Sequence, residues 1–464
     1  MLATAALPSM TAAASFVASG GGLPGQRLPL LSLAPFVLLL LAIAVLPLFA
    51  PHFWEPNRNK GFVSAVLSIP FAAWLLLAYG AEGAREVQHA VFDFVSFMAL
   101  LASLFVISGG IYVRGSLSGT PLANSVMLGL GAVLANLIGT TGASMVLLRP
   151  FLRANEERND RVHQVVFFIF VVSNCGGLLT PLGDPPLFLG FLKGVPFEWT
   201  LRLWPQWLLV NGLLILAFNL VDQWKLAREE HERAGSQLEQ VLEHEPLAIE
   251  GKRNLIFLAG VVAVIVARGQ AWGTAPDPWP FGLQEGAMVA LAFAAYNATP
   301  ARLRAANRFS FGPIVEVAVL FAGIFVTMIA PLVYLNAHGS TLGVTKTWEF
   351  FWATGALSSF LDNAPTYLTF AALAAGQFGV SVLGDRYLGE FLAQGVRPEA
   401  LLTAISCGAV FMGANSYIGN GPNFMVKAIA EENGVRMPSF FGYMAWSIAI
   451  LVPTFVVVTF VFFR

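Results

Sequence analysis

The chain has 464 residues, of which 56% are apolar and only 11% are charged, whereas soluble proteins carry about 25% charged residues. Its formal net charge of −1 gives no sign of a nucleic acid partner. The only two cysteines, Cys175 and Cys407, lie in apolar runs and form neither a disulfide framework nor a metal-binding pattern. We therefore expect a multi-pass protein of the inner (plasma) membrane, surrounded by the lipid bilayer, with no cofactor.

Residues 1–29 form a lead of small residues without the basic start of a signal peptide, and we expect it to be flexible or weakly helical. Long apolar runs then predict an all-α chain of membrane spans. The predicted spans cover about 30–50, 61–80, 91–113, 162–192, 202–222, 254–268, 284–298, 313–336, 397–430 and 440–463.

Two further apolar stretches, 122–150 and 347–375, are each interrupted midway by polar residues. We expect each to be a re-entrant hairpin, which enters the membrane, turns at a polar tip and leaves on the same side. Such a tip is tolerated only where protein or a cavity surrounds it.

Basic residues are distributed unevenly over the connections that this arrangement predicts. With both termini outside, 17 of the 26 Lys and Arg residues fall on cytoplasmic connections, as the positive-inside rule requires. The longest polar stretch, 223–253, then becomes a cytoplasmic linker of mixed charge.

The halves on either side of this linker repeat one another. Spans that start at 30, 61 and 91 correspond to spans that start at 254, 284 and 313. Residues 30–222 and 254–464 therefore each contain five spans and one hairpin. Because five is odd, the second half has to be inverted relative to the first, an arrangement that recurs in secondary transporters.

One predicted span in each half is broken by Gly and Pro residues. The breaks run over residues 173–186 in span 162–192 and 412–423 in span 397–430. Proline removes a backbone donor and glycine permits unusual backbone angles, so both helices should unwind midway. The freed carbonyl and amide groups can hold an ion or a substrate.

Acidic residues inside apolar runs mark the predicted site. Asp184 lies in the first break and Asp362 at the tip of the second hairpin. A carboxyl group withdrawn from water can exchange a proton for a cation near neutral pH. We expect these two carboxylates to hold a transported cation, with capping of a helix start as the alternative role. The predicted ion- or substrate-binding residues are Asp184, Asp362, Asn363, Thr140, Thr141, Ser144, Ser173, Asn174, Thr180, Thr366, Asn420 and Asn423.

Three other titratable residues are candidates for a proton relay. Asp93 and Glu316 occupy nearly equivalent positions at the starts of two spans, and His89 precedes Asp93 by one helical turn. Water-facing helix ends are the alternative. His163, beside Arg161, is expected at the membrane interface.

Four of these motifs, in this order, resemble the ion transporter superfamily, above all the sodium/proton antiporters of the NhaD type and the citrate transporter-like proteins. The motifs lie at residues 173–177, 180–184, 358–365 and 413–423. The resemblance implies a scaffold region, a mobile transport region and a homodimer with elevator-type movement. Asp184 departs from the antiporter pattern, because Pro185 and Pro186 follow it as in the citrate branch.

The sequence thus predicts a secondary active transporter and no enzyme. Sodium/proton antiport, or exchange of another monovalent cation, accounts for the acids. Sodium- or proton-coupled transport of citrate or a dicarboxylate is the alternative, and arsenite or silicate export within the same superfamily stays open. The partners are accordingly the bilayer and a small inorganic cation or a carboxylate, with Na⁺ or H⁺ as the coupling ion.

Overall fold

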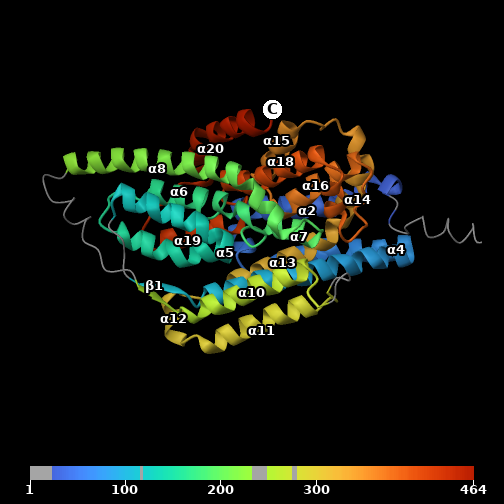
Figure 1. The fold of residues 1–464 in the computed structure, drawn as a ribbon, viewed down its shortest axis with the longest axis horizontal. Coiled ribbons are helices and arrows are strands. Elements are labelled where there is room, and N and C mark those ends of the chain that lie inside the picture. The colour runs from blue at the N-terminus through green and yellow to red at the C-terminus, as the bar shows by residue number, and fades with distance from the viewer. Residues whose placement is uncertain (1–22, 24, 115–118, 233–247, 274–278) are drawn as a thin grey trace, which may run out of the picture.

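Helices make up nearly all of this computed structural model, which describes residue 23 and residues 25–114, 119–232, 248–273 and 279–464. In Figure 1 the long helices run roughly side by side, so that most connections gather at two opposite ends. In the first half the elements are η1 (Gly25–Arg27), η2 (Leu30–Leu33), α2 (Ala34–Phe49), α3 (Pro51–Trp54), α4 (Asn57–Ser108), β1 (Tyr112–Arg114), α5 (Pro121–Ala154), α6 (Val162–Val171), η3 (Cys175–Leu179), α7 (Pro185–Leu192), η4 (Phe197–Leu203) and α8 (Trp204–Glu232).

The second half follows a similar order. Its elements are β2 (Ala248–Glu250), α10 (Arg253–Gly269), α11 (Leu283–Ala298), α12 (Ala301–Ala306), α13 (Gly312–Thr327), α14 (Ile329–His338), η5 (Gly339–Thr341), α15 (Thr347–Ser358), α16 (Asn363–Gln377), α17 (Tyr387–Ala393), α18 (Val396–Met412), η6 (Gly413–Asn415), α19 (Gly421–Glu432) and α20 (Phe440–Phe462).

A small antiparallel sheet, in which β1 pairs with β2, departs from the all-helical prediction. Val113 lies opposite Ile249, so the end of the linker is fixed against the segment that follows α4. The rest of the predicted linker divides between α8, which continues to Glu232, and residues 233–247, which lie outside the described residues.

Helix α5 folds back on itself at Gly139. This residue has φ 77° and ψ 155°, a conformation that glycine adopts without a steric penalty. The side chains of Asn124 and Asn155 exchange two hydrogen bonds of 2.8 Å. In one straight helix their 31-residue separation would span about 46 Å. The segment 122–150 is therefore a hairpin with its tip at Gly139.

Helices α15 and α16 form the second hairpin. The Gln377 side chain, at the end of α16, donates a 2.6 Å hydrogen bond to the carbonyl of Val344, just before α15. Halfway toward the tip, the rings of Phe350 and Phe370 are 6.5 Å apart. Both segments that the sequence marks as interrupted thus turn at their polar residues.

Helix α4 contains two arms, because Gly80 breaks it with φ 56°. Phe97 of the second arm stacks on Phe321 of α13 with ring centroids 4.9 Å apart. Ser64 of the first arm lies against Gly323 of the same helix. Helices α4, α10, α11 and α13 thus form one side of the molecule, while α8, α15, α18 and α20 lie on the opposite side in Figure 1.

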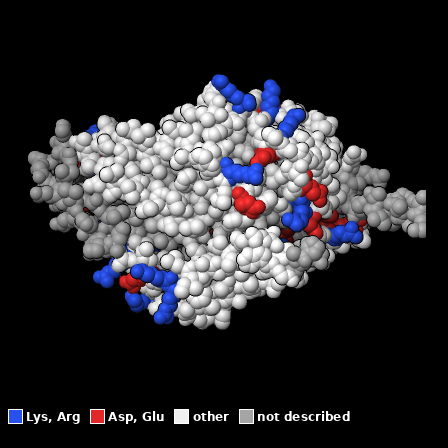
Figure 2. Space-filling model, in the orientation of Figure 1, with Lys and Arg blue, Asp and Glu red and all other residues white. Residues whose placement is uncertain are grey.

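The connections that are predicted to be cytoplasmic meet at one end of the molecule. Asn57 contacts Gly312, and Arg161 contacts Asn433. Further contacts at this end are β1 with β2, Arg149 with Asn307, Lys225 with Asp160 and Arg308 with Glu432. In Figure 2 a largely uncharged surface separates two groups of charged side chains, one of them over the β1–α12 end. This is the pattern that a membrane-spanning protein requires.

Six of the described helices, or seven if the bent pair α13 and α14 counts as one span, are long and apolar enough to cross a membrane. The ten predicted spans differ from this number for physical reasons. Helix α4 joins two of them, α10 and α11 have only 17 and 16 residues, and the helix formed by α18 and α19 is interrupted. The chain is an α-helical membrane protein.

The fold-back of α5 can be tested by crosslinking. In a background with Cys175→Ala and Cys407→Ala, the double variant Asn124→Cys/Asn155→Cys should form an intramolecular disulfide under mild oxidation. The folded chain with the disulfide should migrate faster in a non-reducing gel. Each single-cysteine variant serves as the control, and failure of the pair to crosslink in a monodisperse sample would contradict the hairpin.

Candidate functional site

The two broken helices are built in the same way. Helix α6 ends at Val171, η3 follows, and α7 starts at Pro185; likewise α18 ends at Met412, η6 follows, and α19 starts beside Pro422. Proline is well suited to the first turn of a helix, where its missing N–H costs nothing. Each break therefore ends in a new helix whose N-terminus points into the protein.

In each break, two glycines allow two backbone segments of the same break to pass in close contact. A Cβ atom added to Gly183 would lie 2.1 Å from the carbonyl oxygen of Gly177. In the second break, one added to Gly419 would lie 2.6 Å from the carbonyl oxygen of Gly413. Both pairs are six residues apart, so the same backbone crossing occurs in both halves.

Asp184 is the charged residue at the centre of this region, and it is 1% exposed. Its carboxylate accepts hydrogen bonds from the Thr140 hydroxyl at 3.0 Å, the Asn420 amide at 3.1 Å and the Asn363 amide at 2.5 Å. These donors come from the first hairpin tip, the second break and the second hairpin tip. Among the described residues, no Lys or Arg is hydrogen-bonded to this carboxylate.

Asp184 occupies the N-cap position of α7, yet its side chain makes no capping hydrogen bond to the first turn of that fully described helix. This matters because an N-cap role was the alternative explanation for an acid at this position. The carboxylate instead faces the meeting point of both halves. The structure therefore does not support capping as the function of Asp184.

Asp362 has a different environment. It is the N-cap of α16, where its carboxylate accepts a 3.1 Å hydrogen bond from the Ala364 amide, and it is half-buried. The next residue, Asn363, donates to the Asp184 carboxylate, so Asp362 lies beside that contact. The predicted pair of site acids is thus one buried carboxylate and one capping carboxylate nearby.

Asparagine side chains join the two breaks. The Asn174 amide donates to the Asn423 side chain at 2.6 Å, and the Asn420 amide also contacts the Ser173 carbonyl at 3.2 Å. Asn423 in turn donates to the carbonyls of Gly413 and Ser416 at 2.8 and 2.9 Å. Carbonyl groups freed by unwinding thus find side-chain partners, the Ser173 carbonyl from the other half and the Gly413 and Ser416 carbonyls within their own break.

The remaining predicted residues divide into two groups. Ser144 and Ser173 share a 2.8 Å hydrogen bond near the centre. Thr180 donates to the Asn136 carbonyl at 2.5 Å, and Thr366 donates to the carbonyl of Asp362 in its own helix at 2.9 Å. The Thr180 hydroxyl therefore joins the first break to the first hairpin, whereas the Thr366 hydroxyl bonds the backbone of its own helix.

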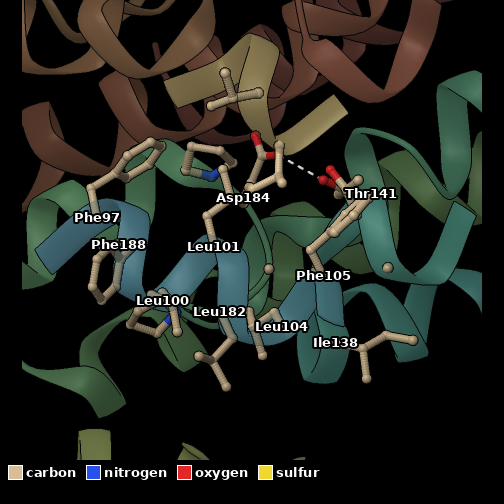
Figure 3. A pocket seen from close by; sticks show the side chains of 18 of the residues that line it. Phe97, Leu100, Leu101, Leu104, Phe105, Ile138, Thr141, Leu182, Asp184 and Phe188 are labelled. Atoms are coloured by element: carbon tan, nitrogen blue, oxygen red, sulfur yellow. Dashed lines mark hydrogen bonds between the residues drawn. The ribbon is translucent and has the colours of Figure 1, made fainter. Parts of the chain in front are cut away.

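A cleft of about 620 Å³ of empty space, part of it open to the outside, borders Asp184 on one side. Figure 3 shows Thr141 and Asp184 beside it, with Phe97, Leu101 and Phe105 of α4 among the apolar side chains that line it. The cleft lies between α4 and α13 on one side and the first hairpin tip and first break on the other. A ligand could reach the buried carboxylate through it.

The three residues of the predicted proton relay do not form one chain. Asp93 pairs with Lys193, His89 pairs with Asp385 at 3.3 Å, and Glu316 pairs with Lys60 at 2.6 Å. Phe94 packs against Phe325, which lies nine residues beyond Glu316. Glu316 is therefore displaced by about 13 Å along α13 from the level of Asp93.

The segment from residue 25 to residue 463, nearly the whole chain, matches the model of a protein family described as "Putative citrate transport". The chain belongs to this citrate transport family. A search of curated proteins found no match. The family confirms the resemblance to citrate transporter-like proteins, and the activity class is membrane transport.

For this member of the citrate transport family, a transported cation would need mixed ligands. No group of three or more His, Cys, Asp or Glu side chains gathers within the described residues. The Asn363 side-chain oxygen, however, is buried and has no hydrogen-bond partner in the described part of the chain. Oxygen atoms of amides, hydroxyls and carbonyls are suitable ligands for hard cations, and Asn363 also donates to Asp184 through its side-chain nitrogen.

Sequence reasoning missed Asn136, which supports the first break. Its amide donates to the Gly176 carbonyl at 2.7 Å, and its oxygen accepts from the Leu179 amide at 2.7 Å. An asparagine inside the apolar stretch 122–138 was the available signal. Ser416, whose hydroxyl donates to the Ser359 carbonyl at 2.5 Å, supports the second break in a comparable way.

A buried ionic cluster was also missed, and His163 belongs to it. His163 is fully buried in the protein and lies 2.8 Å from Asp222. Arg158 pairs with Asp222 at 3.0 Å and with Glu229 at 3.1 Å. Asn124 donates to Asp222 at 3.0 Å, so this cluster joins the base of the first hairpin to α6 and α8.

The glycine crossing in the first break gives a stability prediction. Gly183→Ala should destabilise the protein by about 1–3 kcal/mol, because the added Cβ meets backbone that cannot move aside. Gly421→Ala is the matched control, because nothing lies within 4 Å of its added Cβ. Thermal unfolding in detergent should show a lower Tm for the first variant only. Equal Tm values would contradict the close crossing.

Proposed function

We propose that this protein is a cation-coupled secondary transporter in which Asp184 binds a proton and a monovalent cation, such as Na⁺, alternately. The observation that carries the proposal is the buried carboxylate of Asp184, which faces polar groups from both halves instead of capping its helix. A single acid that competes for a proton and a metal ion is the simplest device for sodium/proton exchange.

The hydrogen bonds around Asp184 are compatible with this exchange. Three donors stabilise the ionised carboxylate, while burial favours the protonated form. A cation would replace part of the donor set and could use the unpartnered oxygen of Asn363. A cation bound here would be held by the Asp184 carboxylate together with neutral oxygen atoms.

The proposal includes the architecture of two inverted repeats. The matching glycine pairs and the equivalent positions of Asp184 and Asn420, each the N-cap of the helix that follows a break, support it. Such repeats place the site near the middle of the membrane. We further place the protein in the inner membrane as a homodimer whose transport region moves as an elevator, on the strength of the superfamily resemblance alone.

Coupled transport of citrate or a dicarboxylate is the second candidate, and the family description favours it. Amide groups of Asn174, Asn363 and Asn420 could then donate to substrate oxygens. A carboxylate next to Asp184 would be repelled unless a cation or proton lies between them. The second candidate thus also needs Asp184 as the coupling group.

Flux measurements distinguish the two candidates. Proteoliposomes that contain a pH-sensitive dye should be challenged in turn with Na⁺, Li⁺, K⁺ and citrate. Antiport predicts that Na⁺ or Li⁺ alone dissipates an imposed pH gradient. A proton flux that strictly requires citrate would overturn antiport and support the second candidate.

Substitution of the central acid tests the coupling group itself. Asp184→Asn should abolish cation-dependent proton flux from about pH 6 to about pH 9, because the amide cannot titrate. Full exchange by this variant at every pH would refute the proposed mechanism.

Asp362→Asn separates charge from capping at the second tip. Asparagine caps helices about as well as aspartate, so α16 should remain intact. If the Asp362 charge contributes to cation binding, flux should fall strongly while Tm stays unchanged. Glu316→Gln, which lies outside the site, serves as the comparison and should show a milder effect on the pH profile. Normal flux by Asp362→Asn would restrict Asp362 to a capping role.

A further inference from the structure

One short helix connects the proposed site to a second group of charges. Helix α7 has eight residues, about 12 Å of helix, with Asp184 at its N-cap and Lys193 at its C-cap. The ammonium group of Lys193 forms an ion pair with Asp93 in the second arm of α4. Both side chains are mostly buried, at 16% and 25% exposure.

This ion pair links α7 to the second arm of α4, two helices that have few other contacts with each other. Helix α4 packs mainly against α13 and α11, whereas α7 packs mainly against α16. The cleft beside Asp184 lies along the same boundary. A shift of α7 and Asp184 along this boundary, relative to α4, would strain the ion pair between Lys193 and Asp93.

The end of α7 is itself held firmly to the second half. The Lys193 carbonyl accepts a 3.0 Å hydrogen bond from the Leu388 amide, and the Tyr367 hydroxyl lies directly against Gly190. Lys193 thus moves with α16 and α17, together with Asp184. The position of its ammonium group relative to α4 is therefore tied to the position of Asp184 and the helices packed around it.

Other charged groups surround the pair. His89 pairs with Asp385, and Arg268 pairs with Glu285. The charged groups that act on Lys193, Asp93 or their neighbours are Arg85, Glu86, His89, Arg268, Glu285, Asp385 and Arg386. Removing the charge of either partner therefore leaves the other as an uncompensated, mostly buried charge.

We propose that Lys193 is a positioning residue for transport, which holds Asp184 beside the cleft by its ion pair with Asp93 and releases it when the site moves. Asp93 then acts as the fixed partner on α4 and not as a proton relay. The inference rests on the proposed function, since only a transporter has to move this site. It predicts that loss of the pair shifts the population away from the conformation described here.

The test uses the accessibility of Thr141, which lines the cleft. In a background with Cys175→Ala and Cys407→Ala, a Thr141→Cys reporter is labelled with a membrane-permeant maleimide. Lys193→Gln and Asp93→Asn should each slow labelling by up to about fivefold, because losing one ion pair changes the conformational equilibrium constant by at most about that factor. The charge-swapped double variant Lys193→Asp/Asp93→Lys should recover most of the rate.

Arg202→Gln is the matched control, because it removes an exposed ion pair with Glu399 and should leave the labelling rate unchanged. All variants are compared at equal monodispersity and Tm. Unchanged labelling in both single variants, or a charge swap no better than either of them, would overturn the positioning role. The readout needs no flux, so its failure is distinguishable from failure of Asp184 as the coupling group.

Discussion

The arrangement of the helices depends on one buried carboxylate, which needs hydrogen-bond donors to offset its loss of contact with water. Placing Asp184 away from water costs several kcal/mol unless donors surround it. Those donors are Thr140, Asn363 and Asn420, which come from three different segments. Both hairpin tips and both broken helices must therefore meet at one point, and the helices around them are arranged so that they do.

Bringing the two broken helices to this point leaves unwound backbone inside the protein. A helix broken in the membrane leaves carbonyl and amide groups without partners, which is tolerated only inside protein. Asn136 satisfies the first break and Asn423 the second, each through backbone groups of the break itself. The asparagines thus serve structure and the presentation of polar groups to a ligand at the same time.

Charged groups away from the centre are arranged as links between bodies. The cluster of Arg158, His163 and Asp222 fastens the first hairpin to α6 and α8, whereas Lys193 and Asp93 join α7 to α4. The Asp222 cluster joins helices that pack directly on one another. The pair of Lys193 and Asp93 instead spans the boundary along which the cleft lies. Buried ion pairs are weak evidence for stability but well suited to fixing a relative position.

Local sequence determined much of this protein. Apolar runs gave the helices, and Gly and Pro clusters located both breaks, because lipid and backbone geometry act on each segment separately. The proline at the start of α7 has a local role that a single sequence reveals, whereas the turn at Gly139 was located by the structure. The sequence also identified most residues of the candidate site. Polar residues inside apolar runs are energetically costly, so they stand out as functional candidates.

Only the tertiary structure decided what each of these residues does. Asp184 and Asp362 look alike in sequence, yet one faces partners 179 and 236 residues away and the other caps its own helix. His163 begins a predicted span, and only the structure shows that it is buried against Asp222, 59 residues later in the chain. Such contacts depend on how distant segments pack, and no local periodicity or spacing contains that information.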